Sequence, residues 1–225
     1  MKKKTKNKKR KIRYGRILLV LVIFCLLVYL LIQLLDFPIK NIYIYNNSIL
    51  TDQEIIDLAG ISDYPSILSI SNNKMEKNLK KNIYIKKAQV VKKKLKEVHI
   101  YIDENYPLFY DLNTKEVILK DGRKTSEFKN CPTLVNYVTD TVYKDFSDAM
   151  LKINKNILDR ISEIKYDPND VDEERFLITM NDGNYVYLTV MHFEKINSYV
   201  EILKNFENQK GILFLDSGEY FQVYE

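Results

Sequence analysis

Residues 17–35 read ILLVLVIFCLLVYLLIQLL, and Gln33 is the only strongly polar residue in this run. A helix of that length rises about 28 Å at roughly 1.5 Å per residue, which is enough to cross the hydrocarbon core of a bilayer. A cleaved signal peptide has a shorter apolar core, followed by small residues, whereas Asp36-Phe37-Pro38 follows here. The run therefore predicts a single uncleaved transmembrane helix.

The tail before this run, residues 1–16, is strongly basic. It contains seven Lys and three Arg and no acidic residue, whereas Asp36 and Lys40 are the charged residues just after the run. Because basic residues are retained on the cytoplasmic side of a membrane, we expect a cytoplasmic tail and an extracytoplasmic chain from Phe37 onward. That outer part holds 25 of the 35 Lys and Arg against all 30 Asp and Glu. A mildly acidic outer part argues against nucleic-acid binding.

Cysteine and histidine are scarce, which limits the chemistry that the chain can perform. Cys25 lies in the apolar run, so Cys131 is the only cysteine outside it and no disulfide framework can form there. His99 is expected on the solvated face of a strand and His192 at the end of another, and neither lies in a catalytic or zinc-binding motif. The acidic run 167–174 lacks the ligand spacing of a calcium loop. We expect no catalytic residue, no metal and no cofactor.

The segment 37–106 predicts a small α+β domain. Thr51 and Glu54 form a capping box for a helix that Gly60 ends. The other elements follow from period-two alternation and from helical spacing of apolar residues: a strand over 39–45, a helix over 72–81, and strands over 83–91 and 95–103.

The segment 107–225 predicts a mostly β domain with helices on one side. Two hairpin turns are marked by Asp121-Gly122 and Asp182-Gly183. The remaining expected elements are strands over 117–119, 175–180, 185–190, 211–215 and 220–224, and helices over 146–160 and 194–206. The chain thus predicts the α+β class: one N-terminal transmembrane helix, a small α+β domain, and a β-rich domain.

This order of elements resembles the FtsQ/DivIB family of bacterial cell-division proteins, in which a POTRA domain precedes a β domain. The segment 37–47, FPIKNIYIYNN, is similar to the start of that POTRA domain, and 95–108, LKEVHIYIDENYPL, to its last strand and exit. Leu119-Lys-Asp-Gly122 resembles the hairpin that opens the β domain, and Cys131-Pro-Thr-Leu134 stands where the family has a Pro-x-Leu turn. The resemblance extends over nearly the whole chain.

The resemblance implies a scaffold of the division machinery rather than an enzyme. It implies FtsB/DivIC-like and FtsL-like single-pass partners, an indirect effect on the septal peptidoglycan synthases, and a place in the cell membrane at the division septum. The last two strands leave an uncovered edge, which a partner segment can extend as a further strand. Carried over by position, the partner-binding residues are Leu215, Ser217, Gly218, Tyr220, Phe221 and Val223.

Other functions stay open at this point. An anchored enzyme acting on cell-wall polymer is one alternative, and a POTRA-type chaperone of membrane insertion is another. Ten lysines lie between Lys74 and Lys96, where Glu76 is the one acidic residue. This cluster is consistent with contact to anionic lipid, wall polymer or an acidic partner, and equally with a plain solvated surface.

Overall fold

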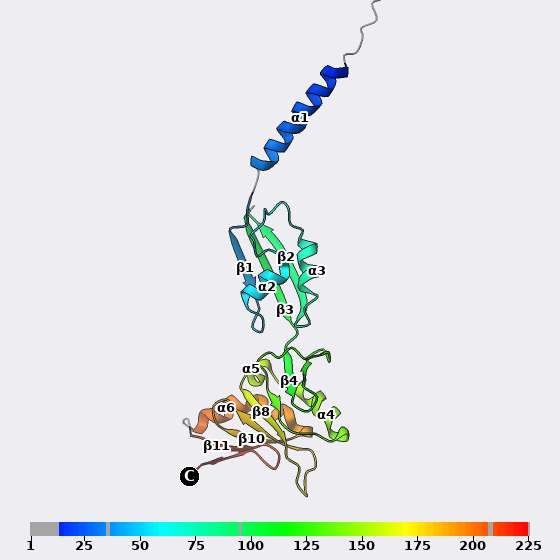
Figure 1. The fold of residues 1–225 in the computed structure, drawn as a ribbon. Coiled ribbons are helices and arrows are strands. Elements are labelled where there is room, and N and C mark those ends of the chain that lie inside the picture. Colours follow the sequence, from blue (N-terminus) through cyan, green and yellow to red (C-terminus); the bar gives the residue numbers. More distant parts are fainter. Residues whose placement is uncertain (1–13, 35–36, 95, 207–208, 225) are drawn as a thin grey trace, which may run out of the picture.

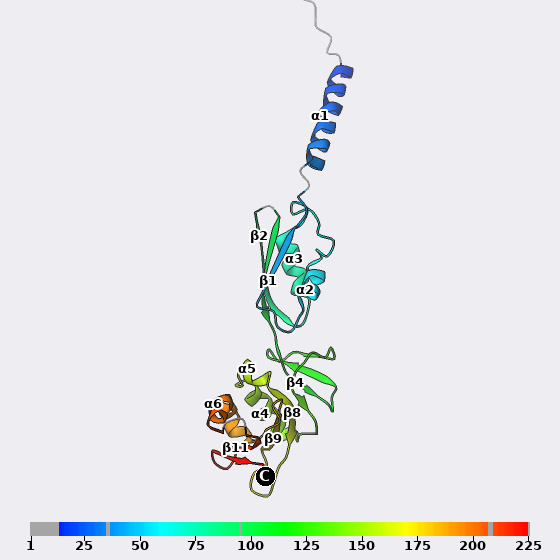
Figure 2. The same ribbon diagram turned by 90° about the vertical axis from the view of Figure 1, so that its left-hand side faces the viewer.

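The computed structural model describes residues 14–34, 37–94, 96–206 and 209–224 (Figure 1). Within them, a long helix is followed by a small domain and then by a larger one, in an extended arrangement seen from two sides (Figures 1 and 2). Most of the basic tail lies outside the described residues. The α+β class is confirmed by one three-stranded and one nine-stranded sheet with helices packed against them.

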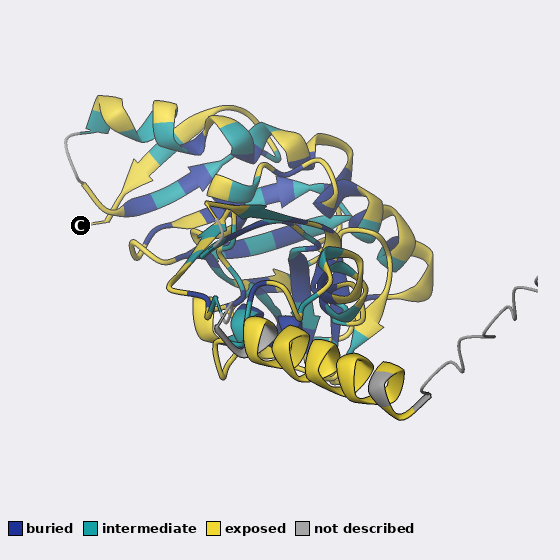
Figure 3. Ribbon diagram, turned by 90° about the horizontal axis from the view of Figure 1, so that it is seen from above, coloured by how far each residue is buried: buried dark blue, intermediate teal, exposed yellow. Residues whose placement is uncertain are grey.

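Helix α1 runs from Tyr14 to Leu34. Its apolar side chains from Ile17 to Leu31 are exposed, as Figure 3 shows from above. Within the side chains that the structure describes, no helix reaches the length and hydropathy required of a membrane span. The transmembrane helix over 17–35 therefore stays a prediction.

The first domain, which is built on the three-stranded sheet, has the expected order of strand, two helices and two strands. Its sheet is ordered β1-β3-β2, with β1 parallel and β2 antiparallel to β3. Side chains of both helices and of the inner sheet face share one core, which includes Ile55, Met75, Leu79 and Ile100. The elements are β1 (Asn41–Tyr45), α2 (Asp52–Ala59), α3 (Asn72–Leu79), β2 (Ile85–Lys93) and β3 (Glu97–Glu104).

The capping box at the start of α2 is confirmed in both of its hydrogen bonds. The backbone N–H of Glu54 donates to the Thr51 hydroxyl, and the Glu54 carboxylate accepts from the Thr51 backbone N–H at 2.8 Å. Gly60 ends the helix with φ of 73°, a left-handed conformation that glycine adopts without steric cost.

The prediction of a solvated His99 is wrong. Val98, Ile100 and Ile102 do face the core, and His99 lies on the opposite face, but it is only 8 % exposed. The rings of Tyr43 and Tyr45 on β1 stack against it, with centroids 4.8 and 5.9 Å away. The sequence pattern identifies the face of a strand, but it does not say which side chains on the neighbouring strand cover that face.

The second domain is built on the nine-stranded sheet, ordered β12-β11-β10-β9-β8-β7-β4-β5-β6. Helices α4, α5 and α6 cover one face of it (Figures 1 and 2) and share a core with its inward side chains, among them Phe146, Ile164, Phe176 and Leu213. The strands are β4 (Pro107–Asp111), β5 (Glu116–Leu119), β6 (Lys124–Thr125), β7 (Thr133–Leu134), β8 (Ile161–Tyr166), β9 (Arg175–Met180), β10 (Tyr185–Thr189), β11 (Gly211–Phe214) and β12 (Tyr220–Val223).

Two expected helices of the second domain are broken. The helix over 146–160 is replaced by α4 (Asp140–Met150) and α5 (Lys155–Leu158), separated at Asn154, whose backbone N–H donates to Asn197. The helix over 194–206 is replaced by η1 (Val190–Ser198), α6 (Tyr199–Leu203) and η2 (Lys204–Phe206), with a kink at His192. Apolar spacing predicted the buried faces, but not the turns that these tertiary contacts impose.

The strands of the second domain agree with the sequence at the two hairpin turns and differ elsewhere. Both glycines of the expected hairpins are confirmed in left-handed turns, Gly122 at φ 83° and Gly183 at φ 87°. The segment 131–134, expected as a turn, instead contributes β7, which pairs in parallel with β4 and β8. Strands β4 and β8 were not expected as separate elements, because their apolar residues sit beside aromatic and charged ones without clear alternation.

The two domains are joined by direct contacts. Val117 and Leu119 of β5 pack into the core of the first domain. Lys129 reaches Glu54 at the start of α2, with Nζ and Oε1 2.6 Å apart, and the Tyr84 hydroxyl donates to the Glu127 carbonyl. The hydrogen bond from Lys129, supported by the bond from Thr51, lowers the pKa of Glu54 to about 2.

Candidate partner-binding site

Strand β12 forms one edge of the large sheet and is paired only with β11 among the described strands. The pairing is antiparallel, with Gln222 opposite Ile212 and Tyr220 opposite Phe214. The backbone N–H of Tyr224 donates to Lys210, so the alternate residues Gln222 and Tyr220 also turn their backbone groups toward β11.

Phe221 and Val223 therefore turn their backbone N–H and C=O groups toward the open edge. These groups have no ladder partner among the described strands of the sheet. An unpaired row of this kind is the template on which an extended peptide adds as a further strand.

A row of aromatic rings crosses the outer face of the sheet and ends at this edge. Tyr187 on β10, Phe214 on β11 and Tyr220 on β12 are neighbours in register. Their ring centroids are 5.3 and 4.6 Å apart, and the rings are stacked. Tyr220 remains 51 % exposed, so the row offers an apolar surface beside the open backbone.

The turn between β11 and β12 is held by charge. Arg175 on β9 donates from Nε to Asp216 at 2.7 Å, and its guanidinium lies 3.5 Å from the centroid of the Tyr187 ring. Burial raises the pKa of the Asp216 carboxyl, but hydrogen bonds from Arg175 and Ser217 outweigh it and leave that pKa below its usual value. A second ion pair joins Lys195 to Glu219 at 3.0 Å.

The six residues expected at the partner site differ in what they offer. Tyr220 presents its ring on the outer face, while Phe221 turns inward against Phe206 but keeps its backbone at the edge. Val223 offers both its backbone and a side chain that is 40 % exposed. Ser217 and Gly218 are exposed in the turn.

Leu215 is different, because it is 1 % exposed and packs in the core. Sequence reasoning missed Tyr187, Phe214 and Arg175. Alternation marks Tyr187 and Phe214 as outward-facing, but only the sheet order brings them beside Tyr220.

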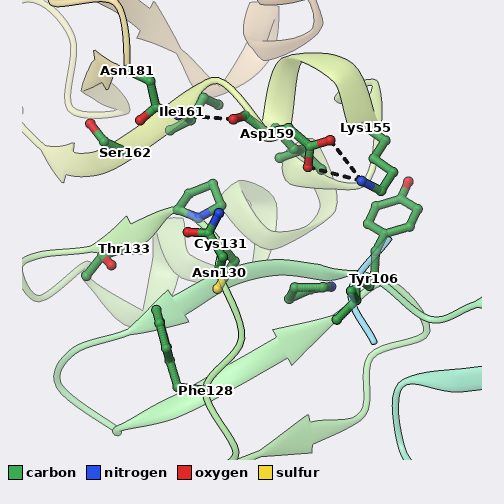
Figure 4. Close-up of a pocket in the computed structure, with 14 residues that line it drawn as sticks. Tyr106, Phe128, Asn130, Cys131, Thr133, Lys155, Asp159, Ile161, Ser162 and Asn181 are labelled. Carbon is green, nitrogen blue, oxygen red and sulfur yellow. Dashed lines mark hydrogen bonds and ion pairs between the residues drawn. The ribbon is translucent and has the colours of Figure 1, made fainter. Parts of the chain in front are cut away.

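A separate cavity of about 260 Å³ lies where the domains meet (Figure 4). Ile49 of the first domain and Tyr106, Phe128, Cys131 and Asp159 are among the residues that line it. Burial raises the pKa of the Cys131 thiol to about 12, so this sulfur is a neutral thiol near pH 7. Lys155 binds Asp159 at 2.8 Å at the wall, and no histidine is among the lining residues.

Comparison with known proteins places the chain in a family. Residues 37–105 match the model of the POTRA domain, FtsQ-type. The cell division protein DivIB of Listeria monocytogenes is 30% identical in an alignment of 231 positions that covers 97% of this chain and 86% of that protein. The cell division protein DivIB of Bacillus anthracis is 27% identical over 98% of this chain and 87% of its own length.

A solved structure, the major extracytoplasmic domain of the trans isomer of the cell division protein DivIB from Geobacillus stearothermophilus, is 22% identical to this chain. It matches 47% of this chain and 96% of that domain, with a TM-score of 0.38. Because the Listeria protein is matched along almost the full length of this chain, and because 37–105 match the POTRA domain, the chain belongs to the DivIB family of bacterial cell-division proteins, with an FtsQ-type POTRA domain.

Proposed function

We propose that the chain is a non-enzymatic, membrane-anchored scaffold of the division machinery that captures an extended segment of a partner on the edge of β12. The observation that carries this proposal is the open row of backbone groups at Phe221 and Val223, beside the exposed ring of Tyr220. Backbone bonds at the edge supply affinity, and side chains beside it supply specificity.

The partners in this proposal are single-pass proteins of the FtsB/DivIC and FtsL types. Family membership supports a role in division, and α1 supports the anchor because its apolar side chains are exposed over most of its length. The basic tail orients the anchor, so that both domains lie outside the cytoplasm. Confinement to one membrane raises the effective concentration of two partners, and a modest contact is then sufficient. Through these partners the chain regulates septal peptidoglycan synthesis.

Substitution of Val223 by proline tests the edge directly. Proline removes the outward N–H without removing a bond to β11, because only the alternate residues face β11. Val223→Thr is the matched control, since it keeps the N–H and a β-branched side chain of similar size.

The full chain in lipid nanodiscs is mixed with the purified FtsB/DivIC-like protein of the same bacterium. We expect Val223→Pro to weaken binding at least tenfold, while Val223→Thr binds as the parent chain does. In cells depleted of the protein, the proline variant should leave filaments with unfinished septa and the threonine variant should restore division. Equal binding and equal rescue by both variants would show that the edge is not the capture site.

A further inference from the structure

The end of the POTRA domain next to α1 is basic. Lys93 and Lys94 are exposed at the end of β2, where the chain turns into β3, and Lys40 is exposed just before β1. Lys96 lies beside them, because its carbonyl accepts from the Lys40 backbone N–H at 2.9 Å. Glu97 approaches Lys94 at 3.5 Å but is only 16 % exposed, whereas the side chain of Lys94 is 80 % exposed.

Covalent geometry fixes this basic end close to α1. Helix α1 ends at Leu34, and Phe37 is the third residue after it. Three Cα–Cα steps of about 3.8 Å span at most roughly 11 Å. Lys96 places its Nζ 5.6 Å from the centroid of the Phe37 ring. The end of β2 and the start of β3 also lie at the end of the domain nearest α1 in both side views (Figures 1 and 2).

An exposed apolar side chain accompanies the lysines. The Nζ of Lys92 donates to the carbonyls of Ile67 and Ile70, at 2.8 and 2.5 Å, and so ties the segment 66–70 to the end of β2. Leu68, in the middle of that segment, is 62 % exposed. Lysines next to exposed apolar side chains suit a membrane–water interface, where the charge reaches headgroups and the apolar part reaches the acyl boundary.

We propose that this end of the POTRA domain, formed by Lys40, Lys93, Lys94, Lys96 and Leu68, binds anionic lipid headgroups of the membrane that α1 spans. The contact holds the domain in a fixed orientation on its anchor and thereby sets the direction in which the β12 edge faces. The proposal rests on the membrane anchor of the proposed function. Two observations favour lipid over a soluble acidic protein as the ligand. The surface begins within a few residues of the anchor, and it carries the exposed apolar side chain of Leu68 as well as charge.

Tryptophan fluorescence tests this contact, since the chain contains no tryptophan. The full-length Leu68→Trp variant is placed in nanodiscs of phosphatidylcholine, or of phosphatidylcholine with phosphatidylglycerol, each with and without brominated acyl chains. We expect a blue-shifted emission and at least twofold stronger bromine quenching in the anionic discs, because each lysine near an anionic surface favours contact by about fivefold.

Charge variants separate this surface from the rest of the lysine cluster. The triple variant Lys40→Gln, Lys93→Gln and Lys94→Gln should reduce quenching in anionic discs to the level in phosphatidylcholine. The matched control Lys77→Gln, Lys80→Gln and Lys81→Gln removes the same charge from the α3 region, whose last residues lead toward the junction with the second domain. It should leave quenching unchanged.

Two contrary results have different meanings. In the first result, the chain incorporates into discs and binds its partner, but bromine quenching changes neither with phosphatidylglycerol nor with substitution of Lys40, Lys93 and Lys94. The lipid contact is then overturned and the proposed function stands. If the chain is extracted from membranes by alkaline carbonate, the anchor is wrong and both proposals fail.

Discussion

Gly211 at the start of β11 lies so close to Gln222 on β12 that a Cβ atom on Gly211 would stand 2.1 Å from the Gln222 carbonyl oxygen. The same added Cβ would lie 2.9 Å from the Cζ atom of the Phe221 ring. Asn184 fixes this glycine from the other side, because its side-chain oxygen accepts from the Gly211 backbone N–H at 2.9 Å. The edge strand is thus positioned by a close approach of two backbones that only glycine permits.

Substitution Gly211→Ala should therefore loosen β12. The added methyl group meets backbone that cannot move aside without breaking the pairing with β11, and overpacking of this kind costs about 1–3 kcal/mol. Thermal unfolding should show a lower Tm, and partner binding should weaken with it.

The matched control is Gly218→Ala in the turn before β12. Its Cβ would meet the Tyr220 ring at 3.5 Å, an ordinary contact, so its Tm should change little. Equal Tm values for the parent and Gly211→Ala would contradict the close approach.

The ring of Tyr220 should contribute to binding without contributing much to stability. It is half exposed and stacks on Phe214, which is itself supported by Tyr187. We expect Tyr220→Ala to weaken partner binding about tenfold, because tyrosine is among the residues that contribute most to the binding energy of interfaces, with little change in Tm. Tyr64→Ala, an exposed tyrosine of the POTRA domain, is the control and should bind normally.

The ion pair between Glu54 and Lys129 should make the junction of the domains sensitive to acid. Glu54 has a folded pKa of about 2, below the usual value of 4.5 for a glutamate. A lowered pKa means that the stabilisation is fully present above about pH 4.5 and is lost as the pH falls through 2. Lys129→Gln should lower the free energy of unfolding near pH 7 by about 0.5–1 kcal/mol.

The difference between Lys129→Gln and the parent chain should shrink as the pH falls through 2, because Glu54 then becomes protonated in both. Lys144→Gln on the exposed face of α4 serves as the charge control. A stability difference independent of pH would mean that Lys129 acts by packing rather than by charge.

Cys131 should be unreactive in the folded chain. Burial raises its pKa to about 12, and the thiolate is the nucleophile, so at pH 8 its alkylation should be slower by a factor on the order of 10³ than in the unfolded chain. The measurement uses a Cys25→Ser background, because Cys25 is exposed on α1. Fast modification of the folded protein by iodoacetamide would refute the burial of this thiol.

Much of the POTRA domain follows from local signals. The Thr51–Glu54 capping box, Gly60 and the alternation along β3 act within a few residues, so the sequence displays them directly. His99 escaped prediction because the two tyrosines that bury it come from β1, more than fifty residues away.

The structure of the second domain is harder to predict from the sequence, because its elements also depend on contacts between residues that are far apart in the chain. Strand β7 exists only because β4 and β8 flank it. Helix α4 ends at Met150, and Asn197 then binds the Lys152 carbonyl and the Asn154 backbone N–H in the segment before α5. Strand β12 is an edge of the large sheet among the described strands, as expected. The identity of the residues whose backbone faces outward required the register of β12 against β11.

Hydrogen exchange of the β12 amides tests the central claim most directly. In the free chain, the amides of Phe221 and Val223 should exchange quickly, while those of Gln222 and Tyr224, which face β11, should be protected. Addition of the FtsB/DivIC-like partner should protect Phe221 and Val223. Saturating partner that leaves both amides exchanging as quickly as before would contradict capture of a strand at this edge.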